Sequence, residues 1–370
     1  MIAVIAALCG AEPPPATAQE GGQGGCLLAP DDLGPSRAPR ALRFGITPGI
    51  AGSAGGEQGA SRPVDERAEL SALDRLRPAR RALVVRLNRL FFSDGAAGVR
   101  RFAREVDRFA AAGFETEVQL RYHPTPAQEG DVAAFERFVR AAVRRLGRRR
   151  SVVAFTVTNE ANFPISANTS DGVYEGAIEA LVGGVVQARR TLDRIDRRHT
   201  DVGFTVAWRY LPNADLAFWR RIGTLGGDRF ARALDFVGAQ IYPGLVWPPL
   251  PLPGRSSGVE MVDALALLRR CYMPLAALGE GTELWVSENG YATNLGRSER
   301  SQSDELSSTL RSVQSVSGTL GVTDYRYFNL RDNLSAGLDL FSAVGLLRDD
   351  YRPKPAFETL RRGIERYGRR

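Results

Sequence analysis

The sequence predicts one α/β domain of the (β/α)8-barrel class, also called a TIM barrel. Short apolar segments alternate with amphipathic helical segments from about residue 41 to the C-terminus, as in repeated βα units with a parallel sheet. Eight apolar segments can be counted, and eight parallel strands can close into a barrel without edge strands. The chain has 370 residues, which exceeds the roughly 250 that such a barrel needs.

The expected strands are mostly continuous apolar runs, as buried parallel strands should be. They cover residues 42–46, 82–87, 116–120, 152–158, 202–207, 236–241, 283–287 and 324–328. Apolar residues at three- and four-residue spacing predict helices over 96–112, 131–146, 172–194, 259–276 and 302–316, and a closing helix over 355–367. An open doubly wound sheet is the alternative, but no G-x-G-x-x-G motif follows any strand.

The first forty residues differ in composition from the rest. Residues 2–11 are apolar and Ala16-Thr17-Ala18 forms an A-x-A site, so we expect a secretory signal peptide over 1–18. A short anchor is the alternative, because no positive residue precedes the apolar run. We expect a flexible Pro/Gly-rich leader over 19–40, a catalytic domain over 41–370, and a secreted or cell-surface location without an integral membrane segment after processing.

The cysteine count adds one expectation. Cleavage of the signal peptide would leave Cys26 and Cys271, which an exported protein could join; two free thiols are the alternative. Two histidines and three scattered cysteines give no metal-ligand cluster, so we expect neither a metal nor another cofactor. The net charge of +7 comes from arginines interleaved with acidic residues rather than a basic stripe, so we expect no nucleic-acid partner.

Polar and aromatic residues gather where the expected strands end. In barrel enzymes the reacting side chains stand at these carboxyl ends. Such a set suits a polyhydroxylated ligand, an oligosaccharide, polysaccharide or glycoside, which offers many hydrogen-bonding groups and flat apolar faces. The candidates are Arg86, His123, Asn159, Glu160, Trp208, Tyr242, Glu288 and Trp247, the last in a Pro-rich insertion over 242–258.

Two carboxylates stand out among them. Glu160 ends the run VVAFTVTNE and Glu288 follows ELWVS, so each directly follows a buried strand, where a carboxylate is costly without a purpose. A helix-cap or ion-pair partner is the alternative for either one alone. Cleavage of a glycosidic bond needs two carboxyl groups, and strands four and seven lie on opposite sides of a barrel mouth. A separation of about 5–5.5 Å is expected for retention of configuration.

These motifs resemble those of the clan A glycoside hydrolases, retaining barrels with catalytic glutamates after strands four and seven. Asn159-Glu160 matches the clan's Asn-Glu pair, and Ser287-Glu288-Asn289-Gly290 resembles the nucleophile segment of family one. DFVGAQIYPG resembles the strand-six segment of the same family, and Arg86 in VVRLN resembles the strand-two arginine of family five. Gln240 and Asn-Glu-Ala depart from the usual motifs, and features reminiscent of families one, five and thirty-nine assign no single family.

The resemblance implies a role for each candidate. Glu160 would be the acid/base and Glu288 the nucleophile of an O-glycosyl hydrolase that acts on β-linked substrates by double displacement. Arg86 and Tyr242 would hold the nucleophile, and Asn159 would hold the sugar's 2-hydroxyl. His123, Trp208 and Trp247 would contact the sugar. The alternatives are an inactive carbohydrate-binding barrel and a transglycosidase that uses the same residues.

Overall fold

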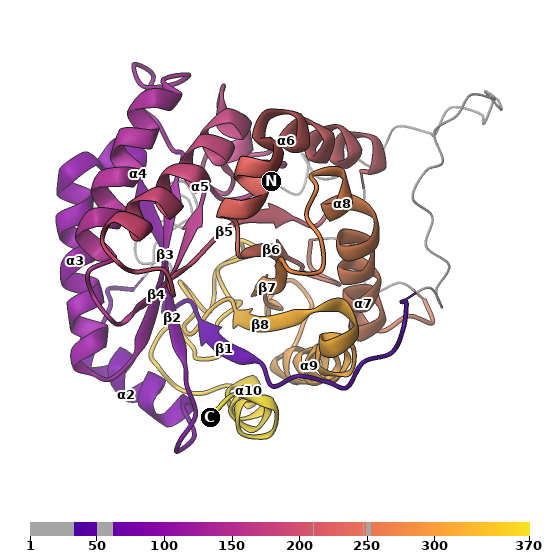
Figure 1. The fold of residues 1–370 in the computed structure, drawn as a ribbon. Helices are drawn as coiled ribbons and strands as arrows, with labels where there is room; N and C mark the ends of the chain where they lie inside the picture. Colours follow the sequence, from indigo (N-terminus) through magenta and orange to yellow (C-terminus); the bar gives the residue numbers. More distant parts are fainter. Residues whose placement is uncertain (1–32, 50–61, 210, 247, 249–252) are drawn as a thin grey trace.

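The computed structural model describes residues 33–49, 62–209, 211–246, 248 and 253–370. Its strands form a closed parallel barrel in sequence order, with the helices around it (Figure 1). The strands are β1 Arg43–Ile46, β2 Val84–Phe91, β3 Glu115–Arg121, β4 Val152–Val157, β5 Asp201–Ala207, β6 Phe236–Gln240, β7 Glu283–Asn289 and β8 Val322–Tyr327. The predicted single (β/α)8 barrel is therefore confirmed.

The helices between the strands bury one apolar face against the barrel. They are α2 Glu66–Leu76, α3 Gly95–Ala111, α4 Val132–Leu146, α5 Ala177–Arg194, α6 Pro212–Ala233, α7 Ser257–Leu267, α8 Met273–Leu275, α9 Glu299–Leu320 and α10 Pro355–Tyr367. Short turns of other helix types occur at Phe92–Asp94, Asp171–Val173 and Leu268–Tyr272. Helix starts are fixed locally: Asp131, for example, accepts the backbone N–H of Ala134 at the start of α4.

Several boundaries differ from the predictions for physical reasons. No periodic stretch predicted α2 or α6, and α6 carries a non-helical Gly227 (φ 51°) that interrupts its pattern. Helix α5 begins at Ala177, after Gly176 in a left-handed conformation, and not at 172. Strand β2 runs to Phe91 rather than 87, because a bulge shifts its register against β3.

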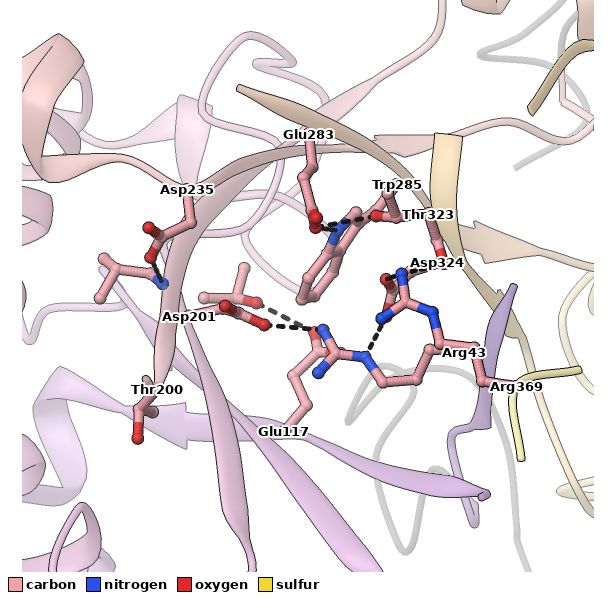
Figure 2. A network of polar contacts seen from close by, with 12 residues as sticks. Arg43, Glu117, Thr200, Asp201, Asp235, Glu283, Trp285, Thr323, Asp324 and Arg369 are labelled. Carbon is pink, nitrogen blue, oxygen red and sulfur yellow. Dashed lines mark hydrogen bonds and ion pairs between the residues drawn. The ribbon is translucent and has the colours of Figure 1, made fainter. Parts of the chain in front are cut away.

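The amino-terminal base of the barrel is closed by charged and aromatic side chains (Figure 2). The Arg43 guanidinium donates to Asp324 at 2.6 Å and to Asp201 at 2.7 Å. Trp285 is fully buried and stacks on Phe236, with the Arg43 guanidinium 4.9 Å from its ring. Trp285 is thus a packing residue of the barrel base and lies away from the mouth.

The N-terminal predictions lie mostly outside the described residues. This applies to the signal peptide over 1–18 and to most of the leader over 19–40. The described part of the leader lies against the C-terminal end of α9, where the Arg40 backbone N–H donates to Ser317 Oγ at 2.8 Å. Cys271 is disulfide-bonded, while Cys26, its expected partner, lies outside the described residues. Within the described ranges, no helix is both long and apolar enough to cross a membrane.

Removal of the indole at the barrel base should destabilise the whole domain. We expect Trp285→Ala to lower the free energy of unfolding by about 3–5 kcal/mol, because it leaves a cavity beneath the Arg43 guanidinium. Chemical denaturation followed by circular dichroism measures this loss. Leu338→Ala is the control, since that side chain is 83% exposed and its truncation should change little. Equal stability of the two variants would contradict this view of the base.

Candidate active site

Glu288 is held by two donors at the carboxyl end of β7. Arg86 Nη1 donates to Glu288 Oε1 at 2.5 Å, and the Tyr242 hydroxyl donates to Oε2 at 2.7 Å. Both donors stabilise the negative charge of the carboxylate. Only 7% of Glu288 is exposed, so the barrel fixes its orientation. The sequence therefore predicted correctly that Arg86, Tyr242 and Glu288 meet.

The two donors are themselves kept in their donating forms. Although burial opposes it, the charges of Glu288 and Glu117 raise the pKa of Arg86 above its ordinary value. Burial, followed by the charge of Glu288, raises the pKa of Tyr242 well above its ordinary value. Tyr242 therefore remains a neutral phenol that donates a hydrogen bond to the carboxylate of Glu288 and carries no negative charge of its own.

A buried ladder of alternating charges continues from this pair down the barrel axis. Glu117 accepts hydrogen bonds from Arg86 at 3.1 Å and from Arg326 at 2.9 Å, and all three side chains are fully buried. Arg326 also donates to Asp324 at 2.8 Å, which joins the ladder to the base in Figure 2. Each buried charge thus has an opposite neighbour, which offsets its desolvation. In order from mouth to base, the charge ladder is Glu288, Arg86, Glu117, Arg326, Asp324, Arg43 and Asp201.

Glu160, by contrast, has a protonated carboxyl group near neutral pH. It follows β4 in a left-handed backbone conformation (φ 49°) that turns the chain sharply at the barrel mouth. Burial, followed by the negative charge of Glu288, raises the pKa of Glu160 to about 8. The side chain is only partly covered, so solvent reaches one side of it. The site therefore pairs a charged carboxylate with a neighbouring carboxylic acid.

Asn159 and Asp171 fix the turn that carries Glu160. Asp171 is fully buried and accepts the backbone N–H groups of Asn159 and Tyr122, each at 2.8 Å. Asn159 Oδ1 accepts from Gln240 at 2.6 Å and from Gln119 at 3.0 Å. These contacts tie the end of β4 to β3 and β6.

Gln119 joins the two halves of the site. Its Oε1 accepts from Arg86 Nη2 at 3.0 Å, while its Nε2 donates to Asn159 Oδ1 at 3.0 Å. A displacement of Asn159 would therefore be transmitted to Arg86 and from there to Glu288. The role expected for Asn159 toward a 2-hydroxyl stays a prediction, because its Oδ1 already has protein partners.

The other predicted contact residues are placed differently. His123 is partly exposed after β3, with its ring 4.6 Å from Phe91 and 5.3 Å from Tyr174. Trp208 is partly buried after β5, and its backbone N–H donates to Gln240 at 2.9 Å. Trp247 lies outside the described residues. Arg86 is fully buried and contacts Glu288 from beneath, as the resemblance implies, while a contact of Arg86 with substrate stays a prediction.

The sequence did not single out Glu117, Gln119 and Arg326. A signal was present: Glu117 and Gln119 occupy alternate positions of an expected buried strand, and Asp324 and Arg326 do so in another. Alternation in a strand places such residues on one side, here the barrel interior. Asp171 offers no comparable signal, because it lies in irregular chain after β4.

Comparisons with known proteins identify solved structures of similar fold. No protein-family model and no curated protein matches the chain. A family 5 (GH5_18) enzyme from Streptomyces cattleya, solved with GlcNAc, has a TM-score of 0.60 and 17% identity, covering 89% of this chain and 81% of that one. The family 1 β-glucosidase of Thermotoga maritima has a TM-score of 0.61 and 13% identity, covering 90% and 100%.

A third structural neighbour is a family 39 glycoside hydrolase from Bacteroides cellulosilyticus WH2. Its TM-score is 0.57 at 13% identity, covering 88% of this chain and 63% of that one. All three are barrel enzymes of clan A, so the fold expected from the resemblance is confirmed. Identities this low establish the fold and assign no family.

The coupling between the two glutamates should be visible by titration. We expect Glu288→Gln to lower the pKa of Glu160, because it removes the neighbouring negative charge. The pKa should stay above the ordinary value, since burial remains. NMR titration of carboxyl-labelled glutamates measures the shift. Asp107→Asn on the outer helix α3 is the control and should leave the pKa of Glu160 unchanged. The same Glu160 pKa in both variants would contradict the electrostatic coupling of the two glutamates.

The centre of the charge ladder should matter for stability. Glu117→Gln keeps the shape but leaves Arg86 and Arg326 without their shared carboxylate. We expect this substitution to cost about 3–5 kcal/mol of unfolding free energy in a denaturation experiment. Glu299→Gln is the matched control, because its pair with Arg348 lies at the surface, is only partly covered, and should contribute little to stability. Comparable losses of unfolding free energy in the two variants would show that the charge ladder contributes no more to stability than a surface ion pair does.

Proposed function

We propose that this protein is a retaining glycoside hydrolase that cleaves β-linked O-glycosidic bonds through a covalent glycosyl-enzyme. The supporting observation is the pair of carboxyl groups in opposite electrostatic surroundings. Glu288 is charged and held by two donors, and Glu160 has a pKa of about 8. Double displacement at an anomeric carbon needs these two states at one site. The family 5 and family 1 fold neighbours, solved with GlcNAc and isofagomine lactam respectively, support a carbohydrate ligand.

Each half of the reaction uses the same two residues. Glu288 attacks the anomeric carbon while Glu160 gives its proton to the departing oxygen. Glu160, now a carboxylate, then takes a proton from water, which attacks the anomeric carbon and releases Glu288. Two inversions at one carbon retain its configuration. Arg86 and Tyr242 hold Glu288 before the attack and receive the carboxylate again after it.

We also propose that the chain works outside the cytoplasm. The disulfide-bonded Cys271 supports an oxidising compartment, and the apolar N-terminus with its A-x-A site supports export. Mass spectrometry of the protein secreted by an expression host would identify the mature N-terminus.

The nucleophile can be identified by covalent trapping. We expect a panel of activity-based glycosyl probes to label Glu288, and peptide mapping of the adduct to locate it. Glu288→Ala should abolish both labelling and hydrolysis of aryl glycosides. Turnover that survives this substitution intact would place the chemistry elsewhere. Absence of turnover in the wild-type protein, together with binding of sugars, would indicate a carbohydrate-binding barrel.

The acid should define the alkaline limb of the pH profile. Because Glu160 must be protonated to act as the acid, kcat/KM should fall as pH rises through about 8. Glu160→Gln should remove this limb and slow hydrolysis of substrates with poor leaving groups by about 10²–10⁴-fold. Substrates with activated leaving groups should be affected less. An alkaline limb that persists in the variant would belong to another group.

A further inference from the structure

Two arginines, one histidine and two aromatic rings lie together on the β2–β3 side of the barrel mouth. We name this group the mouth cluster; it consists of Arg89, Phe91, Arg121, His123 and Tyr174. The Arg89 and Arg121 guanidinium carbons lie 5.3 Å and 5.4 Å from the ring centre of Phe91. The His123 ring lies 4.6 Å from the same ring. No step of the proposed reaction uses this cluster.

The bulge in β2 places Arg89 in this group. Leu87 pairs with Val118 and Leu90 pairs with Leu120, so two residues of β2 stand opposite Gln119 alone. Gln119 directs its side chain into the barrel toward Arg86. The extra residue re-aims the end of the strand, as bulges beside active sites do.

The two arginines differ in how their charges are balanced. Arg121 donates to the buried carboxylate of Asp171, at 2.9 Å from Nε. Arg89 has no ion pair and no hydrogen-bond acceptor for its guanidinium within the described part of the chain, where its contact is the face of Phe91. The acidic residue that acts on it, Asp94, is already paired with Arg101 at 2.7 Å. Arg89 is therefore a partly buried cation without an ion-pair partner among the described residues, where only the charge of Asp94 acts in its favour.

The protonation states fit this description. Burial, followed by the charge of Arg121, lowers the pKa of Arg89 to about 10, so the side chain stays positive at neutral pH. Burial, followed by the charge of Arg121, also lowers the pKa of His123, so the imidazole is neutral there. His123 Nδ1 is buried without a hydrogen-bond partner in the described structure. The positively charged Arg89, which has no described ion-pair partner, thus lies near the neutral His123 ring, whose Nδ1 is free to form a hydrogen bond with a ligand.

The mouth cluster adjoins the reacting groups. The charge of Arg121 acts on Glu160, and the charges of Arg89 and Arg121 both act on His123. A sugar unit held beside Glu160 would therefore reach the cluster. A neutral sugar could accept hydrogen bonds from Arg89 but would leave its charge unbalanced in a partly desolvated place. A carboxylate, sulfate or phosphate oxygen pair would balance the charge and match the planar fork of the guanidinium.

We propose that the substrate is an acidic carbohydrate, whose anionic group is bound by Arg89 while His123 contacts a hydroxyl of the same sugar unit. This inference rests on the proposed glycosidase function, which it deepens by naming the substrate class. The anion can come from a uronic acid or from a sulfate or phosphate ester, since all three offer two oxygens to one guanidinium. The alternative is that the Arg89 guanidinium binds no ligand and only packs against the Phe91 ring, which would give Arg89 a structural role.

Matched aryl glycosides that differ only in the anionic group test the proposal on the full chain. The set is an aryl β-glucoside, the corresponding β-glucuronide, and the glucoside 6-sulfate and 6-phosphate. We expect at least one anionic member to exceed the neutral one in kcat/KM, and the preferred member identifies the anion. Arg89→Gln should lower kcat/KM for that member by about 10- to 100-fold, the value of a charge-assisted contact, and should lower it much less for the neutral glucoside, which loses at most a neutral hydrogen bond.

Two further variants guard against loss of folding. Arg89→Lys keeps the charge without the fork and should retain an intermediate preference, with circular dichroism as the check on folding. Arg100→Gln, an exposed arginine on α3, should leave all four substrates unchanged. A wild-type preference for the neutral glucoside, or an equal loss on neutral and anionic members in Arg89→Gln, would overturn the proposal while the glycosidase function stands.

The glycosidase function itself fails by a different outcome, in which no member is hydrolysed and no probe labels Glu288. Titration calorimetry then tests the anion site independently of hydrolysis. It compares the affinities of glucuronate, glucose 6-sulfate and glucose 6-phosphate with the affinity of glucose. Tighter binding of an anionic sugar that disappears in Arg89→Gln would support the site. Binding of none of them, or binding that Arg89→Gln leaves intact, would overturn it.

Discussion

The buried carboxylate of Glu117 is the contact on which the rest of the barrel interior depends. It receives Arg86 from the mouth side and Arg326 from the base side, and all three side chains are fully buried. Two guanidinium groups this deep in a barrel would be unstable without the carboxylate between them. The ladder that results connects the mouth of the barrel with its base, and Figure 2 shows the base, so the proposed catalytic geometry and the stability of the fold use the same residues.

The ladder also explains how two residues of the same type acquire different protonation states. Glu288 is the top member of the ladder and receives a guanidinium and a phenol on its two oxygens. Glu160 lies outside the ladder, and no described side chain donates a hydrogen bond to its carboxyl group. Burial and the charge of Glu288 therefore outweigh the opposing charges of Arg121 and Arg86, and they raise the pKa of Glu160 to about 8. The difference in protonation between Glu160 and Glu288 therefore comes from the positions of the charged side chains of β2, β3 and β8, not from the glutamates themselves.

Much of this arrangement could be predicted from the sequence, because parallel barrel strands bring their carboxyl ends to one rim. That rule placed Arg86, Tyr242 and Glu288 at one rim, the resemblance to clan A hydrolases implied that the first two hold the third, and the structure confirms their contacts. The interior of the ladder was not predicted, although Glu117 and Arg326 alternate with other polar residues in strands expected to be apolar. Asp171 could not be predicted at all, since its contacts with Asn159 and Tyr122 arise only when irregular chain folds back over β3.

Arg89 shows the limit of strand periodicity most clearly. The apolar run ends at Leu87, so the sequence predicts that the strand ends there, but the strand continues through a bulge to Phe91. A bulge breaks the alternation that assigns side chains to faces, and no period in the sequence reveals it. The positions beyond the bulge are also free of the ladder, whose members cannot change without leaving a buried charge unpaired. The barrel interior thus fixes the positions of the two glutamates on which the proposed reaction depends, while the mouth residues outside the ladder, Arg89 among them, are where the proposed substrate preference can vary without loss of the fold.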